Sequence, residues 1–175
     1  MKLSLLAGAS AALLLSVSAQ AHITLEAPKA AVGSYYMAVL RVPHGCQGSD
    51  TTRIRVKIPE GVLGVKPQPK AGWTLDITQG AYEKPQQFHG AQLDKGVREI
   101  SWSGDLPDAY YDEFVFRGFL SSSLKAGDTL YFPVVQECKQ GVDRWIDTTS
   151  DEESENAAPR VRLVAPAKGQ GHGHK

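Results

Sequence analysis

Apolar and polar residues alternate along much of this chain. The clearest case is the segment 53–58, where every second residue is apolar, as in a strand with one face in a core and the other in water. Proline and glycine at 59–61 end this segment. Similar short segments recur between turn-forming residues, at 22–26, 35–42, 73–78, 97–103, 113–119, 129–135, 144–147 and 161–164. The pattern predicts an all-β protein.

The strand pattern also indicates how the strands pack. No window of 11 or more residues after position 21 keeps a 3.6-residue apolar period, so we expect little helix. Two packed antiparallel sheets bury the apolar faces of many short strands. We therefore expect an immunoglobulin- or fibronectin III-like antiparallel β-sandwich over residues 22–166. A closed barrel is the alternative, because strand spacing does not separate the two architectures.

The first 21 residues have the pattern of a secretory signal. Lys2 precedes an apolar stretch at 3–17, and the small residues at 18–21 form a cleavage site before His22. The apolar run is shorter than the roughly 20 residues that span a bilayer. We expect cleavage between Ala21 and His22, which leaves a periplasmic or secreted protein without a membrane span.

The length and charge of the mature chain indicate which kinds of partner it can bind. Removing 21 of the 175 residues leaves 154, enough for one domain with a hydrophobic core. Only Lys2 is lost among the charged residues, so 18 basic side chains face 19 acidic ones. Since no basic run occurs, nucleic acid is not expected as a partner.

The acidic stretch 151–156 is expected to be a solvated loop. The tail 167–175 contains no apolar residue after Ala167 and is therefore expected to be disordered. His172 and His174 in this tail either bind metal loosely or have no role.

Two cysteines, Cys46 and Cys138, are present. In an oxidising compartment an even pair is expected to form a disulfide. The closed loop of about 90 residues would stabilise the fold by about 4–5 kcal/mol. As thiolates the two cysteines could instead bind Cu(I), a soft ion.

His22 has unusual chemistry if it is the first residue of the mature chain. Its α-amine and its imidazole Nδ1 can then bind one metal and close a chelate ring. The α-amine titrates at about 7.7–8.0, so a divalent metal displaces its proton at modest cost. Two nitrogens in this arrangement suit tetragonal Cu(II). Otherwise His22 is simply the residue that follows the cleavage site.

The expected strand order brings a second histidine near His22. If 35–42 runs antiparallel to 22–26, the loop 43–46 lies beside His22. His44 is then either a further imidazole at the metal, directly or behind its ligands, or an ordinary solvated loop residue. Cys138 could reach the same end of the domain and bridge Cys46.

Several short motifs occur in a fixed order along the chain. They are AHITL at 21–25, RVPHGC at 41–46, PKAGW at 69–73, YDEF at 111–114, YFPVVQ at 131–136 and RW at 144–145. Together they resemble the YcnI-type copper-binding domain family over essentially the whole mature domain. The resemblance implies an immunoglobulin-like sandwich outside the cytoplasm. It also implies Cu(II) binding through one amino-terminal histidine, with an acidic side chain and a tryptophan at the site.

Carried to this chain, the resemblance assigns these roles to His22, Glu113 and Trp145. Some family members have an acidic residue in the second strand, where this chain has none at 34–37, so Asp112 and Glu137 compete with Glu113. Without the family, Glu113 would be the solvated end of a strand and Trp145 a packing residue. An indole nitrogen has no free lone pair, so we expect Trp145 to form a wall of the site. The other tryptophans, Trp73 and Trp102, are assigned to the core.

The function expected from these features is non-catalytic binding of Cu(II), in copper acquisition, tolerance or cuproenzyme maturation. The expected partners are the copper ion and another copper-trafficking protein that receives it. One alternative is a copper-dependent oxidative enzyme, which needs a second histidine, for which His44 and His89 are available. Another is a structural or interaction sandwich without metal. Neither a nucleophile elbow nor phosphate-binding glycine spacing occurs, so no enzyme is expected.

Overall fold

The computed structural model describes residues 22–149 and 154–167. The expected signal segment 1–21, the tail from 168 with its two histidines, and residues 151–153 of the acidic stretch lie outside the described residues. The described residues form strands and no helix. The strands are β1 (Thr24–Leu25), β2 (Lys29–Ala31), β3 (Tyr35–Val42), β4 (Thr51–Lys57), β5 (Val62–Pro67), β6 (Thr74–Phe88), β7 (Ala91–Leu106), β8 (Asp112–Leu120), β9 (Thr129–Tyr131), β10 (Val134–Cys138), β11 (Val142–Trp145) and β12 (Arg160–Val164).

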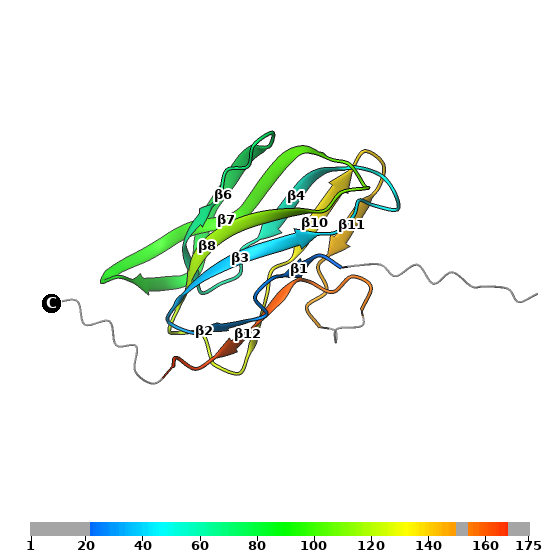
Figure 1. Ribbon diagram of the computed structural model, residues 1–175. Helices are drawn as coiled ribbons and strands as arrows, with labels where there is room; N and C mark the ends of the chain where they lie inside the picture. Colours follow the sequence, from blue (N-terminus) through cyan, green and yellow to red (C-terminus); the bar gives the residue numbers. More distant parts are fainter. Residues whose placement is uncertain (1–21, 150–153, 168–175) are drawn as a thin grey trace, which may run out of the picture.

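Two larger sheets form the expected sandwich (Figure 1). One has the order β1-β3-β8-β5 and the other β11-β10-β4-β7-β6. A third sheet, β2-β12-β9, lies beside β1. Strand pairs within the described residues are antiparallel except β2 with β12, which is parallel. The prediction of an antiparallel β-sandwich is therefore confirmed, with this one parallel pair added.

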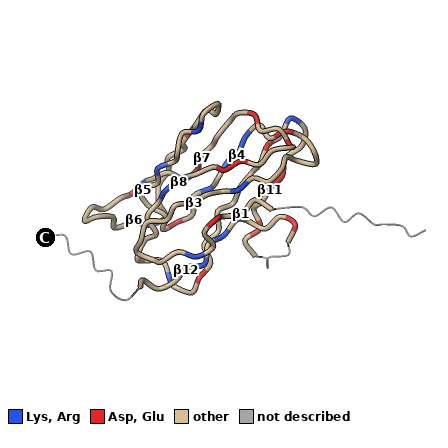
Figure 2. Tube along the Cα trace, in the orientation of Figure 1, with Lys and Arg blue, Asp and Glu red and all other residues tan. Residues whose placement is uncertain are grey.

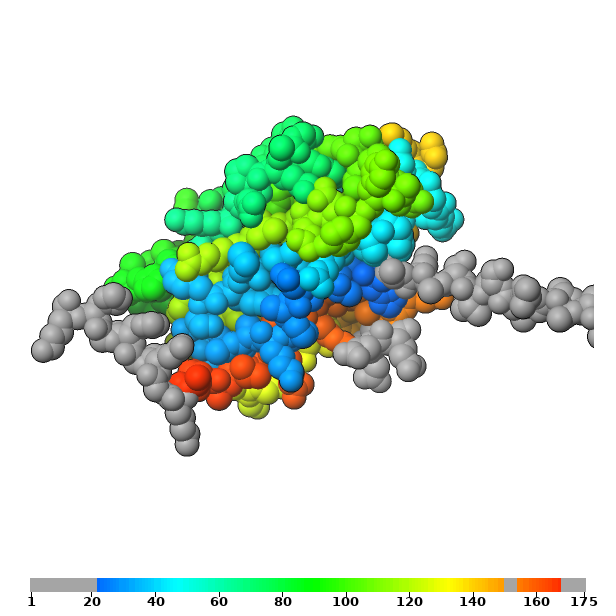
Figure 3. Space-filling model, in the orientation of Figure 1, coloured from blue at the N-terminus to red at the C-terminus, as the bar shows by residue number. Residues whose placement is uncertain are grey.

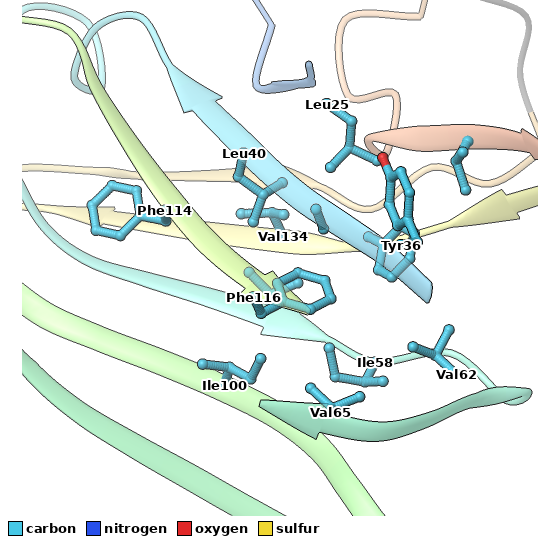
Figure 4. Close-up of a cluster of buried hydrophobic side chains, with 14 of the residues drawn as sticks. Leu25, Tyr36, Leu40, Ile58, Val62, Val65, Ile100, Phe114, Phe116 and Val134 are labelled. Atoms are coloured by element: carbon cyan, nitrogen blue, oxygen red, sulfur yellow. The ribbon is translucent and has the colours of Figure 1, made fainter. Parts of the chain in front are cut away.

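The core lies between the two larger sheets (Figure 4). In β4 the side chains of Ile54 and Val56 are buried while Arg53 stays at the surface, as the alternating pattern predicts. Phe114 and Phe116 of β8 are buried in the same cluster. Each such side chain contributes about 1.5–3 kcal/mol by leaving water. The alternation in sequence is thus the physical basis of the sandwich.

Proline breaks one expected strand. The segment 129–135 divides into β9 and β10, which belong to different sheets. Pro133 lies between them and has no N–H to donate to a ladder, although its carbonyl accepts from Lys57 N at 2.9 Å. Phe132 before it is fully buried. The chain therefore passes from the small sheet to the five-stranded sheet at this point.

The hairpin of β6 and β7 is much longer than the two segments predicted for it. Its tip lies over the far end of β3 and β8, where Phe88 packs on Phe119 with ring centroids 5.7 Å apart. His89 Nε2 lies 2.9 Å from the hydroxyl of Tyr35. Gly64 of β5 has a φ of +56°, and a Cβ there would lie 2.6 Å from the Phe88 ring, so the close approach requires glycine.

The tryptophans assigned to the core differ in burial. Trp102 is fully buried, and its Nε1 donates to the carbonyl of Gln68 at 3.1 Å. Trp73 is only half-buried and packs edge-on against Phe114, with centroids 4.8 Å apart. It precedes β6 instead of lying within it, so its ring covers the sheet margin at Gly104. The assignment is confirmed for Trp102 and too strong for Trp73. Within the described ranges, no helix is long and apolar enough to cross a membrane.

Candidate functional site

His22 and Trp145 meet at one end of the sandwich. β1 pairs antiparallel with the end of β3, Thr24 opposite Arg41, as the sequence predicts. Ile23 is buried and anchors the start of this strand, which leaves His22 half-exposed. The His22 ring lies 5.4 Å from the Trp145 ring, with the planes tilted by 49°. Figure 1 shows the end of β11 near the start of β1. The structure thus brings together two site residues that are far apart in sequence.

A buried glutamine connects Trp145 with the loop that contains His44. Gln136 is 1% exposed, and its Oε1 accepts from Trp145 Nε1 at 3.1 Å. Its Nε2 donates to the carbonyl of His44 at 2.7 Å and to the hydroxyl of Thr51 at 2.8 Å. Sequence reasoning missed this residue. The available signal was a polar side chain two residues after Val134, at a position that the period-2 pattern points inward.

His44 has one engaged and one unengaged ring nitrogen. Nδ1 lies 2.6 Å from the carbonyl oxygen of Gly45. A carbonyl can only accept, so Nδ1 carries the hydrogen, and in the neutral imidazole Nε2 keeps a lone pair. Nε2 is buried and has no hydrogen-bond partner within residues 22–149 and 154–167. This tautomer, fixed by a backbone carbonyl, is the usual form of a metal-binding histidine.

A disulfide holds the His44 loop against β10. Cys46 and Cys138 are bonded, with Cα atoms 6.0 Å apart, which confirms the predicted bridge. The alternative of two metal-binding thiolates does not hold here, because both sulfurs are bridged. Gly45 N also donates to Asp108 Oδ1 at 2.8 Å.

An ion pair also stabilises the loop that contains His44 and Cys46. Lys139 Nζ lies 2.8 Å from Asp50 Oδ2, and Asp108 N donates to Asp50 Oδ1 at 2.9 Å. These hydrogen bonds, the one from Lys139 first, hold the pKa of Asp50 below its usual value. Hydrogen bonds to Asp50 and then to Asp105 raise the pKa of Lys139. The loop is therefore fixed by covalent and polar contacts together.

Glu113 is engaged by a cation. Thr24, Arg41 and Glu113 are register partners on β1, β3 and β8, so two strand spacings, about 10 Å, separate Glu113 from β1. Arg41 lies between them and contacts Glu113 at 3.4 Å and Glu26 at 3.0 Å. The Tyr111 hydroxyl donates to Glu113, which raises the pKa of that tyrosine. The structure therefore places a guanidinium, and not open space, between Glu113 and β1.

The other carboxylates suggested by the sequence are also ion-paired. Asp112 binds Lys70 at 2.6 Å, and Glu137 binds Arg55 at 2.9 Å. A carboxylate that sequence reasoning missed is Asp143, whose Oδ2 is buried without a hydrogen-bond partner in the described part of the chain.

Asp143 belongs to the same face as the residues already described. It lies two residues before Trp145 on β11, and its register partner on β10 is Gln136. Residues two apart on a strand share a face, so Asp143 and Trp145 flank the same glutamine that binds His44. The period-2 spacing from Trp145 was the signal that could have found it. No group of three His, Cys, Asp or Glu side chains among the described residues is arranged to hold a metal.

Gln136→Leu is expected to destabilise the protein by about 2–3 kcal/mol. The substitution leaves the Trp145 Nε1 and the His44 carbonyl without their partner, and unpaired buried polar groups cost about 1–3 kcal/mol each. Urea unfolding followed by tryptophan fluorescence measures the change. Thr52→Val is the control, since the Thr52 hydroxyl donates to the Glu137 carbonyl and to no other described residue. An equal effect of both substitutions would contradict the linking role of Gln136.

Comparison with known proteins first defines the class of fold. A crystal structure of an uncharacterized protein from Nocardia farcinica, described as having an immunoglobulin-like fold, is similar to this chain with a TM-score of 0.61 and 24% identity. The similarity covers 82% of this chain and 99% of that one. The chain is thus an immunoglobulin-like β-sandwich. It belongs to the family described as a domain of unknown function, DUF1775, which matches residues 22–163. No protein of curated function matches the sequence.

Proposed function

We propose that this protein is exported, that its mature chain begins at His22, and that it holds Cu(II) through the α-amine and Nδ1 of that residue. The observation that carries the proposal is the contact of the His22 ring with buried Trp145, at 5.4 Å. Signal cleavage before His22 would free the α-amine where the fold already fixes the ring. The proposal agrees with the resemblance of the chain to YcnI-type copper-binding domains.

The surroundings of His22 favour a copper site over a fortuitous terminus. Trp145 is only 2% exposed, so its indole forms a rigid apolar wall beside the imidazole. Ile23 anchors the strand that starts one residue later, which limits the positions of the terminal amine. A ligand held in place loses less entropy when it binds. Two nitrogens with open positions around them are suited to tetragonal Cu(II).

Two side chains are candidates to complete the coordination. His44 Nε2 and Asp143 Oδ2 are the buried ligand-type atoms at this end that lack a hydrogen-bond partner in the described residues. Both residues flank Gln136, which is bonded to Trp145. Glu113, assigned from the resemblance, would first have to leave Arg41 and Tyr111. We therefore favour His44 or Asp143 over Glu113 as the further ligand.

The proposed role is that of a carrier, which receives copper and passes it to another copper-trafficking protein. His22 lies at the edge of the sandwich, half-exposed, where a partner can reach the metal. His89, the other histidine considered for an oxidative enzyme, bonds to Tyr35 at the opposite end of β3 from Arg41. Six residues of strand correspond to about 20 Å. His89 therefore lies too far away to supply a second imidazole, which leaves His44 as the candidate for one. The proposed carrier role includes no catalytic step.

Adding one glycine before His22 is expected to change the electron paramagnetic resonance spectrum of bound Cu(II), because the glycine amine can bind the metal together with Nδ1 only through the amide nitrogen between them, which gives a different set of nitrogen ligands. Cu(II) titration of the correctly processed protein, read by electron paramagnetic resonance for nitrogen coordination, measures the change. Mass spectrometry verifies that the reference protein starts at His22. His89→Ala is the control and should leave affinity and spectrum unchanged. An unchanged spectrum after the extension would disprove the chelate.

The same titration identifies the further ligand. His44→Ala is expected to remove one nitrogen from the spectrum if His44 binds, whereas Asp143→Asn changes affinity without changing the nitrogen count. Glu113→Gln is the matched acidic variant and should have no effect. If only Glu113→Gln lost Cu(II) binding, Glu113 would be the further ligand, as the resemblance implies.

A further inference from the structure

A groove of about 1080 Å³ runs beside His22, between β1 and the small sheet. His22 and Thr24 line one side. The small sheet contributes Lys29, Thr129, Arg160 and Arg162 to the other. Figure 3 shows the N-terminal residues in dark blue beside the orange residues that precede and begin β12. The groove is therefore a concave surface distinct from the Gln136 side of the domain.

The small sheet presents positive charge to this groove. Lys29 and Arg162 are register partners on the parallel strands β2 and β12, so their side chains lie on the same face. Arg160 lies two residues from Arg162 and therefore has the same orientation. In Figure 2 basic positions follow β12 and the strand beside it. Three cationic side chains thus share one face of a small sheet.

Within the groove lining, no carboxylate of a described residue lies beside Lys29 or Arg162. The lining includes hydroxyl groups but no Asp or Glu among the residues that the structure describes. Lys29 and Arg162 make no ion pair with a described residue. Arg162 Nη1 reaches the Thr129 hydroxyl at 3.5 Å. Like charges on neighbouring strands destabilise a sheet. A bound anion would offset the repulsion between Lys29 and Arg162.

We propose that the groove binds a small oxyanion with several negative charges, carried by phosphate or carboxylate groups. The guanidinium of Arg162 can donate two parallel hydrogen bonds to such a group, and Lys29 adds a mobile ammonium. Hydroxyls of Thr24 and Thr129 supply further donors at the walls. A concave surface with charge of one sign concentrates counter-ions. The site requires no metal.

Because the groove lies beside His22, the bound anion would also affect copper binding. This extension rests on the proposed function. His22 belongs both to the groove lining and to the pair with Trp145. An oxyanion in the groove would lie beside the proposed metal and could give it an oxygen ligand. Copper would then be captured or released together with an anionic chelator.

Lys29→Gln/Arg162→Gln is expected to weaken anion binding at least tenfold. Isothermal titration of the metal-free mature protein with pyrophosphate and with citrate, at low ionic strength, measures affinity. Amide shifts in ¹⁵N spectra should locate the site at residues 29, 129 and 162. Lys66→Gln/Lys95→Gln is the matched control, because both lysines are exposed on β5 and β7 and make no ion pair with a described residue. Binding of pyrophosphate alone would identify phosphate as the ligand class, and binding of citrate alone would identify carboxylate.

Two results would overturn the proposal. One is that neither anion binds, and the other is that the control pair weakens binding as much as the groove pair. The groove pair should also unfold at the same or a higher temperature than the parent, because like-charge repulsion is relieved. A marked fall in melting temperature would show that these residues are structural. Anion binding that persists in the protein with an added amino-terminal glycine separates this inference from the copper proposal.

Discussion

Cys46→Ala/Cys138→Ala is expected to lower the free energy of unfolding by about 4–5 kcal/mol. The disulfide joins residues 92 positions apart, and a loop of that length restricts the unfolded chain by this amount in the chain-entropy model. Alanine is chosen because Cys46 is 3% exposed, so a serine hydroxyl there would be buried. Urea unfolding measures the change. Reduction of the parent protein should produce a loss of similar size, and a loss below about 1 kcal/mol in both would contradict the prediction.

The same variant tests how the disulfide affects the His44 loop. The bridge and the Gly45 to Asp108 hydrogen bond fix the loop at two adjacent residues, Cys46 and Gly45. Without the bridge, amide exchange in residues 43–49 should become faster while β8 stays protected. Any accompanying loss of Cu(II) affinity should be no larger than that of His44→Ala, if His44 is a ligand.

Trp145→Ala is expected to cost about 3–5 kcal/mol, the usual range for removing a buried tryptophan. It also leaves Gln136 Oε1 without a donor and removes the wall beside His22. Thermal unfolding measures the loss of stability. A variant this destabilised gives no clear information on copper, so the binding test uses the milder Trp145→Phe.

Trp102→Phe is the matched control for that milder variant. Trp102 is also buried and also donates an indole hydrogen bond, to the Gln68 carbonyl, but it has no contact with His22. Both phenylalanine variants should lose similar stability. Only Trp145→Phe should alter the Cu(II) spectrum. Equal spectra in the two variants would show that Trp145 has no part in the site.

The sequence predicts the strands best where one face is buried. β3 agrees with the predicted segment 35–42 because apolar residues mark its inner face throughout. Most residues in the outer part of the β6–β7 hairpin are exposed, and the few that are buried or half-buried, such as Tyr82 and Phe88, do not form a regular apolar alternation. β2 has only three residues and is held by β12, a partner distant in sequence. Such strands depend on tertiary pairing, which local pattern does not reveal.

The candidate site was only partly predictable for a related reason. His22 and Trp145 stand out as residue types with special chemistry, and the antiparallel pairing of β1 with β3 follows from chain order. The partner of a charged side chain depends on register across strands. Arg41 faces Glu113 because β3 and β8 pair with that offset, and no property of Glu113 itself indicates this. Gln136 and Asp143 were missed because their roles arise from neighbours on another strand.

The parallel pairing of β2 with β12 has a consequence for biogenesis. β2 follows the first strand of the domain, yet its neighbour in the small sheet is the last strand, which ends at Val164. β9 likewise pairs in that sheet with β12. The small sheet can therefore form only after the residues up to Val164 have been synthesised. Until then β2 has no partner strand, so the small sheet is completed only after all the strands of the two larger sheets have been made.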